Sequence, residues 1–168
     1  MDRLKAVITN LQKEIKIPTG IRLLIRKCCH AVLREEGLSG HYEVNINFLD
    51  DTQIRELNLE YRKVDAPTDV LSFPTGDGKT FDTNAETGAG MLGDIAISIP
   101  KVFSQAAHYG HSVQREFAYL TVHSMLHLLD YDHAQGGIAA VRMREKEESV
   151  LAMLGLQRDI SYVVTEDK

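Results

Sequence analysis

Apolar and polar positions follow two different periods along the chain, and these periods predict a series of strands and helices. From Tyr42 to Phe48 every second residue is apolar, which is typical of a strand with one buried face. Between Thr19 and Gly37 the apolar residues recur every three or four positions, which predicts a helix that ends at the glycine. The same patterns predict strands at 69–73 and 92–98, a short helix after 50–52, and helices at about 100–109, 112–129 and 138–154.

Two segments are less regular. Residues 4–11 contain β-branched side chains but also an apolar stripe with helical spacing, and we favour a strand. Residues 75–90 carry four glycines among polar residues and predict a long loop, of the kind that is kept for function or left mobile. The order of elements predicts an α/β (α+β) fold, in which a small mixed sheet of about four strands packs with about five helices.

Composition favours a single globular domain over residues 1–168, with 157–168 as a flexible tail. The chain is 43% hydrophobic and 26% charged, which excludes disordered, collagen-like and coiled-coil proteins. No apolar run approaches the roughly 18 residues that a membrane span needs, so we expect neither export nor a membrane partner. The only cysteines, Cys28 and Cys29, are adjacent; we expect reduced thiols in a buried helix of a cytoplasmic protein.

Charge is spread unevenly. The chain has 19 lysines and arginines against 24 aspartates and glutamates, a net charge of −5, which argues against nucleic-acid binding through bulk positive charge. We expect no DNA partner. Eight basic and two acidic residues lie in residues 1–34, so contact with a polyanion would rely on this part of the chain. Solvated helix faces are the simpler interpretation for most of these basic side chains.

Three of the seven histidines, His123, His127 and His133, fall within eleven residues. His123 and His127 are four apart in a predicted helix, so their rings are neighbours, with about 5–6 Å between Cβ atoms. His133 follows Asp130, Tyr131 and Asp132, and aspartate accepts a left-handed backbone that turns the chain back. The pattern predicts a metal site at the end of a long central helix. Three imidazoles suit one zinc ion, although nickel, cobalt or copper also bind them, and the open fourth position is typical of catalysis.

The competing interpretation is that one or two of these histidines are ordinary core or surface residues. Two imidazoles on an apolar helix are costly without partners, which favours the metal. Ser124 stands where a metalloprotease of the His-Glu-x-x-His type carries its general base, so peptide hydrolysis of that kind lacks its base. Glu116, seven residues before His123, and Asp94 are candidates to support the ligands. A helix cap or a solvated carboxylate is the alternative for each.

The histidine segment resembles the zinc motif of the YbeY family of single-strand-specific metallo-endoribonucleases. That motif is His-Gly-x-Leu-His-Leu-x-Gly-Tyr-Asp-His, and this chain has His123-Ser124-Met125-Leu126-His127-Leu128-Leu129-Asp130-Tyr131-Asp132-His133. Two further blocks are similar to the family's: residues 57–74, which end in Pro67-Thr68-Asp69-Val70-Leu71-Ser72-Phe73-Pro74, and Leu92-Gly93-Asp94-Ile95. The resemblance covers about residues 41–156. Ser124 and Asp130 each replace a family glycine; a serine fits mid-helix, whereas Asp130 must adopt a left-handed conformation at a modest cost.

The resemblance implies a zinc-dependent endoribonuclease that matures the 3′ end of 16S ribosomal RNA and takes part in ribosome quality control. The implied partners are single-stranded RNA and the small ribosomal subunit with its associated proteins. The resemblance also implies that His123, His127 and His133 hold one zinc ion and that Arg62 is the family's essential arginine. A guanidinium binds two phosphate oxygens and stabilises the charge of a pentacoordinate transition state. A surface arginine at a helix C-terminus is the alternative.

Two other functions stay open at this point. One is a non-catalytic, zinc-containing ribosome assembly factor, which the open metal position disfavours. The other is a zinc hydrolase of a different substrate, such as a peptide or a small ester, and the absence of glutamate at position 124 disfavours the peptide.

Overall fold

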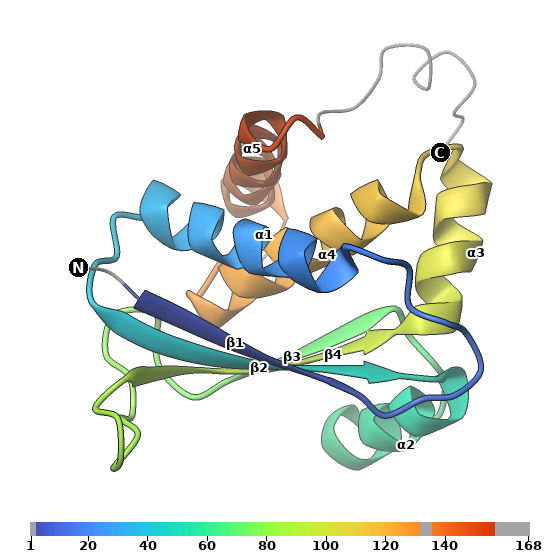
Figure 1. Cartoon of the computed structure of the whole chain (residues 1–168), viewed down its shortest axis with the longest axis horizontal. Helices are drawn as coiled ribbons and strands as arrows, with labels where there is room; N and C mark the ends of the chain where they lie inside the picture. The colour runs from blue at the N-terminus through green and yellow to red at the C-terminus, as the bar shows by residue number, and fades with distance from the viewer. Residues whose placement is uncertain (1–2, 132–135, 157–168) are drawn as a thin grey trace.

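The computed structural model describes residues 3–131 and 136–156, and a four-stranded mixed sheet lies at its centre (Figure 1). The strands are β1 (Arg3–Asn10), β2 (His41–Leu49), β3 (Val70–Pro74) and β4 (Gly90–Ser98). They are ordered β1-β2-β4-β3; β1, β2 and β4 are parallel, and β3 runs antiparallel to β4 at the edge. The predicted mixed sheet and the strand near residues 4–11 are both confirmed.

Helices cover the two faces of the sheet unequally. They are α1 (Ile21–Glu35), α2 (Asp51–Arg62), α3 (Ile99–Tyr109), α4 (Val113–Leu128) and α5 (Gly137–Met153). Figure 1 shows α1, α4 and α5 on one side of the sheet and α2 alone on the other. Among the described residues, no helix has both the length and the apolar character needed to span a membrane. The predicted α/β architecture is confirmed, and α4 is its central helix.

Local sequence signals explain where these helices begin. Asp50 caps α2 through a reciprocal capping box, in which its side chain accepts from the Gln53 backbone N–H at 2.8 Å and the Gln53 side chain accepts from the Asp50 N–H at 2.9 Å. Ser98 and Ser112 cap α3 and α4 in the simpler way, with one side-chain acceptor each. The polar residues at these boundaries therefore set the starting points of the helices that carry the site.

The main core lies between the sheet and α1, α4 and α5. Strand residues such as Ile46 and Phe48 pack there against α4, where the Phe48 and Phe117 rings are 5.9 Å apart. Cys28 and Cys29 of α1 are buried in this core as free thiols, as predicted. Burial raises the pKa of Cys28 to about 12 and also raises the pKa of Cys29. A smaller cluster joins α2 to the other face: Leu49, Ile54, Leu71 and Ala96.

Two glycines allow the chain to approach the C-terminal end of α4 closely. Gly93 on β4 has φ +139°, and a Cβ there would lie 2.3 Å from the Phe73 carbonyl oxygen and 3.0 Å from the Leu128 side chain. Gly78, within the long loop of residues 75–90, has φ +91° and would clash with the Leu129 carbonyl oxygen at 2.7 Å. A side chain at Gly93 would therefore displace β3 first, and one at Gly78 would displace the end of α4, where the histidines lie.

Candidate metal centre and active site

His123 and His127 lie one turn apart near the C-terminal end of α4. Their rings are 4.6 Å apart between centroids and nearly perpendicular, at 82°, and their Nε2 atoms are 3.1 Å apart. Most of the remaining residues of α4 are buried, so the helix has a fixed position against the sheet and α1. The four-residue spacing therefore brings both rings to one point, as the sequence predicts.

The other nitrogen of each ring has an acceptor. Glu147 of α5 is buried, and its carboxylate accepts from Nδ1 of His123. The backbone carbonyl of Tyr131 accepts from Nδ1 of His127 at 2.8 Å. A neutral imidazole that donates from Nδ1 carries its lone pair on Nε2. These two contacts therefore fix both rings in the tautomer that metal ligands adopt.

The turn after α4 supplies the Tyr131 carbonyl. Asp130 has φ +75°, the left-handed conformation expected for it. The Asp130 N–H donates to the His127 carbonyl and the Tyr131 N–H donates to the Leu126 carbonyl, each at 3.0 Å, which is a Schellman motif. Asp130 thus adopts the conformation for which the family motif has glycine. His133 lies outside the described residues.

The two histidines fit a zinc ligand pair. Zinc–nitrogen bonds of about 2.0–2.1 Å at a tetrahedral angle place two ligand nitrogens about 3.3 Å apart, close to the 3.1 Å seen here. With a proton on one of the two nitrogens this contact is a hydrogen bond. With both nitrogens deprotonated their lone pairs repel each other, and a cation between them removes the repulsion. Within residues 3–131 and 136–156, no three His, Cys, Asp or Glu side chains gather as a ligand set. The described part of the chain therefore supplies two of the three predicted ligands.

Both histidines open onto a pocket of about 570 Å³, which we call the histidine pocket. It is lined by Arg62, Thr68, Asp69, Val70, Leu71, Ser72, Pro74, Tyr119, His123 and His127. Most of its wall comes from the Pro-Thr-Asp-Val-Leu-Ser-Phe-Pro block, which forms β3 and the turn before it. The structure thus brings Arg62, from the last turn of α2, to the same pocket as the paired histidines.

Arg62 is held in place from two sides. One of its terminal nitrogens, Nη2, donates to the Ser72 carbonyl at 2.8 Å, and its Cζ lies 5.2 Å from the centre of the Phe73 ring. A guanidinium has five N–H donors in one plane, and this hydrogen bond uses one of them. The arrangement holds a positive charge on the wall of the pocket that the two imidazoles also line, where a phosphate group would meet it.

Comparison with known proteins agrees with these observations. The family model described as Endoribonuclease YbeY matches residues 7–155. The chain belongs to the YbeY family. The match begins well before residue 41, so it includes the second half of β1 and all of α1 as well as the three sequence blocks.

Curated relatives extend over most of the chain. The Endoribonuclease YbeY of Desulforamulus reducens is 45% identical over 152 residues, covering 90% of this chain and 98% of the relative. That of Chloroflexus aurantiacus is 46% identical over 149 residues, covering 87% and 97%. The solution structure of TM1509 from Thermotoga maritima shares the fold, with a TM-score of 0.58 at 21% identity over 89% of this chain and 91% of the other.

Two residues of this YbeY-family site, Glu147 and Tyr119, were not predicted from the sequence. Glu147 lies 24 residues after His123, and the available signal was its position in the buried stripe of α5, with Met143, Val150 and Leu151. Tyr119 lines the histidine pocket one turn before His123, with ring centroids 5.6 Å apart. Burial, together with the nearby Glu147 and Asp69 carboxylates, raises the pKa of Tyr119. Its phenol therefore stays protonated and can donate a hydrogen bond.

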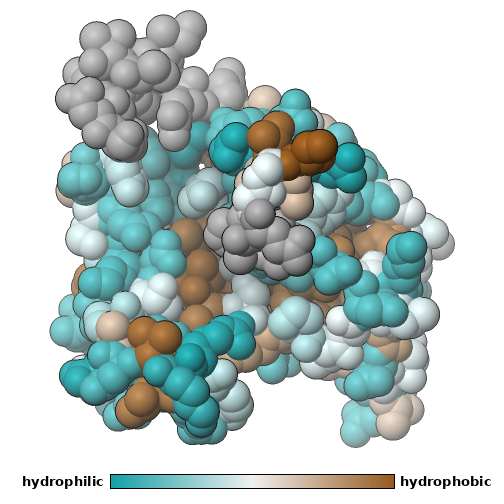
Figure 2. All heavy atoms as spheres, turned by 180° about the vertical axis from the view of Figure 1, so that it is seen from behind, coloured by the Kyte–Doolittle hydropathy of each residue, from teal (hydrophilic) through white to brown (hydrophobic). Residues whose placement is uncertain are grey.

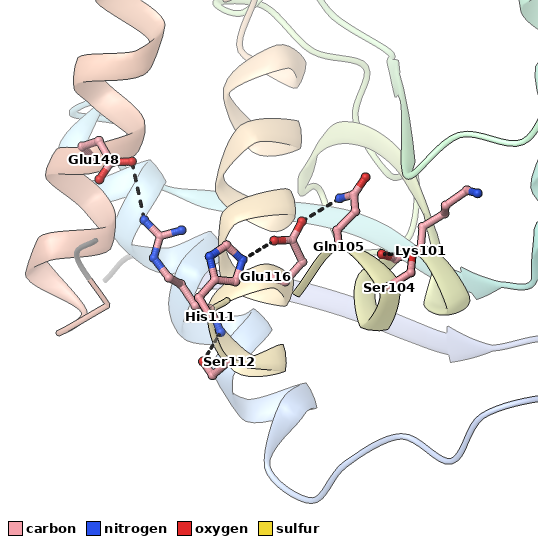
Figure 3. A network of polar contacts seen from close by, with 8 residues as sticks. Lys101, Ser104, Gln105, His111, Ser112, Glu116 and Glu148 are labelled. Atoms are coloured by element: carbon pink, nitrogen blue, oxygen red, sulfur yellow. Dashed lines mark hydrogen bonds and ion pairs between the residues drawn. The ribbon is translucent and has the colours of Figure 1, made fainter. Parts of the chain in front are cut away.

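The hypothesis that Glu116 supports His123 is wrong. Figure 3 shows Glu116 near the other end of α4, between Gln105 of α3 and His111. Its Oε2 accepts from Gln105 Nε2 at 2.7 Å, and its Oε1 contacts His111 Nε2 at 2.6 Å. Glu116 therefore ties α3 to α4, and Glu147 takes the supporting position at His123.

Asp94 does not support the ligands either. Its Oδ1 accepts from Asn45 Nδ2 at 2.9 Å, on the sheet face opposite α4. Ser124, which replaces a family glycine, is fully buried in α4, and its Oγ has no hydrogen-bond partner among the described residues. The hydroxymethyl group is accommodated, as expected, without a polar role.

Proposed function

We propose that this chain cleaves single-stranded RNA as a zinc-dependent endoribonuclease, with the 3′ end of 16S ribosomal RNA in the small ribosomal subunit as its substrate in the cytoplasm. Its family is that of endoribonucleases, hydrolases acting on RNA. The metal, the residue roles and the ribosomal substrate are the proposed part. The observation that carries the proposal is the histidine pocket, which is lined both by an anchored guanidinium and by two paired imidazole nitrogens.

The described residues have separate tasks in this reaction. His123 and His127 would hold the zinc ion through Nε2, and His133 would be the third ligand. Zinc supplies Lewis-acid chemistry at such a position. Arg62 binds the non-bridging phosphate oxygens and stabilises the negative charge that grows in the transition state. Tyr119, kept protonated by burial, offers a hydrogen-bond donor on the pocket wall.

The position of the site favours a flexible strand over a duplex. The His123 side chain is only 16% exposed, so a phosphodiester must enter the histidine pocket to reach it. A single strand can bend its backbone into such a pocket, whereas the backbone of an A-form duplex follows a fixed helical path. With a net charge of −5, the chain gains little affinity from bulk electrostatics, and we expect the ribosomal surroundings to supply specificity.

The test combines zinc analysis with cleavage of a single-stranded fragment of the 16S 3′ end. Wild type is compared with His127→Ala, Arg62→Ala and the matched control Arg55→Ala. Arg55 lies on the same helix as Arg62 but is exposed and paired with Asp65 at 2.7 Å. We expect about one zinc per wild-type chain. Arg62→Ala should keep the zinc and lose about 10²- to 10³-fold in kcat, His127→Ala should lose both zinc and cleavage, and Arg55→Ala should behave as wild type.

A wild-type protein that holds zinc but cuts no RNA would overturn the proposal. That result, with RNA or subunit binding intact, would favour a non-catalytic assembly factor. Hydrolysis of a peptide or ester by the same protein would favour another zinc hydrolase. Equal cleavage by all four proteins would mean that the activity comes from a contaminant and that the assigned residues have no role in it.

A further inference from the structure

The sheet face opposite α4 has a second pocket, which we call the sheet pocket. Of the described helices, α2 alone packs on this face, and Figure 1 shows the segment between β3 and β4 under the other end of the sheet. In Figure 2, the view from behind, a notch separates two lobes along the lower edge. The sheet pocket has a volume of about 420 Å³ and is lined by Asn45, Asn47, Leu57, Tyr61, Phe73, Asp94, Ile95 and Ala96.

The walls of the sheet pocket are aromatic and its floor is polar. Tyr61 is 56% exposed, and its ring meets that of Phe73 edge-on, with 5.3 Å between centroids. On the floor, Asn45 and Asp94 are register partners on β2 and β4 and share a hydrogen bond. An exposed ring beside amide and carboxylate groups is a combination that binds planar, hydrogen-bonding ligands.

The sheet pocket and the histidine pocket are neighbours across the edge strand β3. Successive side chains of a strand point to opposite faces; accordingly, Ser72 lines the histidine pocket and Phe73 lines the sheet pocket. Arg62 reaches round this edge, because it bonds the Ser72 carbonyl and lies 5.2 Å from the Phe73 ring centre. One guanidinium therefore contacts a wall of each pocket.

We propose that the sheet pocket binds the base of a nucleotide next to the phosphate held by Arg62, and that it selects a base with an exocyclic amino group. This inference rests on the proposed function. Tyr61 supplies the stacking surface, and Asn45, Asn47 and Asp94 read the base edge. An RNA strand that crosses β3 places a phosphate in the histidine pocket and an adjoining base in the sheet pocket.

The charges of the sheet pocket fit a base rather than a phosphate. Asp94 would repel a phosphate, and a carboxylate only accepts hydrogen bonds. Adenine, cytosine and guanine each present an exocyclic amino group that donates, whereas the exocyclic groups of uracil are carbonyl oxygens. The N3–H of uracil also donates, but it lies between these two oxygens, which a carboxylate repels. Asp94 therefore favours the three amino-bearing bases over uracil, and the aromatic wall adds stacking energy that does not depend on the base.

The test uses short single-stranded RNAs in which each nucleotide beside the cleaved bond is in turn A, C, G, U or abasic. Wild type is compared with Tyr61→Ala, Asp94→Asn and the control Leu59→Ala, an exposed residue of α2 that does not line the sheet pocket. We expect uracil at one position to raise the wild-type KM about fivefold or more relative to the amino-bearing bases.

The variants separate the two parts of the sheet pocket. Tyr61→Ala should raise KM about 5- to 100-fold on substrates with a base there, and leave kcat and the abasic substrate nearly unchanged. Asp94→Asn keeps the shape and the Oδ1 acceptor, so it should mainly reduce the discrimination against uracil. Leu59→Ala should match wild type. The proposal would be overturned if Tyr61→Ala and Asp94→Asn kept the wild-type dependence of KM on the base. It would also be overturned if KM rose equally for substrates with and without a base at that position.

Measurements of RNA binding show whether the sheet-pocket proposal or the proposed function is the one that fails. The same RNAs, carrying a fluorescent label, are titrated into His127→Ala and into His127→Ala/Tyr61→Ala, and anisotropy is measured. Binding that depends on the base and on Tyr61, with no cleavage by wild type, would support the sheet pocket and reject the endoribonuclease assignment. Cleavage by wild type with base-independent binding would reject the sheet pocket alone.

Discussion

The two ends of α4 carry the same pair of chemical groups in different settings. At its start, Glu116 contacts His111 and Gln105; at its end, Glu147 contacts His123 (Figure 3 shows the first). Both glutamates are buried. The difference lies at the second nitrogen of the ring: Nε2 of His123 lies 3.1 Å from Nε2 of His127 and opens onto the histidine pocket, to which His111 does not contribute.

This comparison teaches that a buried histidine–carboxylate pair is not by itself a functional site. A carboxylate fixes the tautomer and orientation of the ring in both places. A metal or catalytic site also needs the other ring nitrogen to face a second ligand nitrogen and to open onto a pocket that a substrate can enter. The pair at the start of α4 joins two helices, and the pair at its end orients the ring of a proposed metal ligand.

Replacing each histidine of the two pairs should give the largest difference. His123→Ala removes a proposed metal ligand, so we expect loss of bound zinc and at least about a 10³-fold fall in kcat/KM. His111→Ala should keep both, but lower the free energy of unfolding by about 1–3 kcal/mol, because a buried Glu116 oxygen loses its partner. Zinc analysis, RNA cleavage and urea unfolding check this. Zinc loss from His111→Ala would contradict the comparison.

Replacing the two glutamates gives a smaller and more specific contrast. Glu147→Gln weakens the acceptor at His123 Nδ1, and we expect a 10- to 100-fold loss of zinc affinity. Glu116→Gln should leave zinc affinity unchanged, since it lies near the other end of α4. Competition with a chromophoric chelator measures both affinities. Equal losses in the two variants would show that the helix as a whole, and not the contact with His123, controls metal binding.

Arg115 offers a weaker test at the start of α4. Its side chain is 7% exposed and lies 3.7 Å from Glu148, and its Nε and Nη2 have no hydrogen-bond partner among the described residues. A buried charge with so little compensation contributes little to stability. Arg115→Met should therefore leave the free energy of unfolding unchanged or raise it by about 1 kcal/mol, with cleavage intact. A loss above about 2 kcal/mol would mean that the pair with Glu148 is a stabilising one.

Asp130→Gly should have the smallest effect. Glycine adopts φ +75° without a Cβ penalty, but it also adds flexibility to the unfolded chain. We expect the two contributions to leave a net gain below about 1 kcal/mol in the free energy of unfolding, with zinc affinity within about threefold of wild type. Thermal unfolding with and without zinc measures this. A large gain in zinc affinity would show that aspartate distorts the turn at His127.

The periodicity of the sequence correctly predicted the features that depend on residues close together in the chain. The alternation from Tyr42 to Phe48 identified β2, and the four-residue spacing identified the facing rings of His123 and His127. The left-handed conformation of Asp130 could also be predicted from the sequence, because few residues other than glycine and aspartate or asparagine tolerate it.

Contacts between distant segments could not be predicted in this way. Glu116 looked suitable because seven residues are nearly two helical turns, but they are also about 10.5 Å of helix rise, too far for a hydrogen bond. Glu147 reaches His123 only because α5 packs against α4, and the approach of Arg62 to the histidines depends on the path of β3. The role expected for Arg62 came from the resemblance to a family, because residue spacing gave no indication that Arg62 lies near the histidines.

The hydrogen-bond acceptors of the two proposed ligands, His123 and His127, differ in how mutation can remove them. His123 depends on a side chain, so one codon change at Glu147 removes its acceptor. His127 depends on the main-chain carbonyl of Tyr131, which every amino acid possesses. Substitutions at 131 therefore leave that acceptor in place as long as the turn keeps its shape. The substitutions that can disturb the support of His127 are instead those at the residues that shape the turn, Asp130 and Gly78.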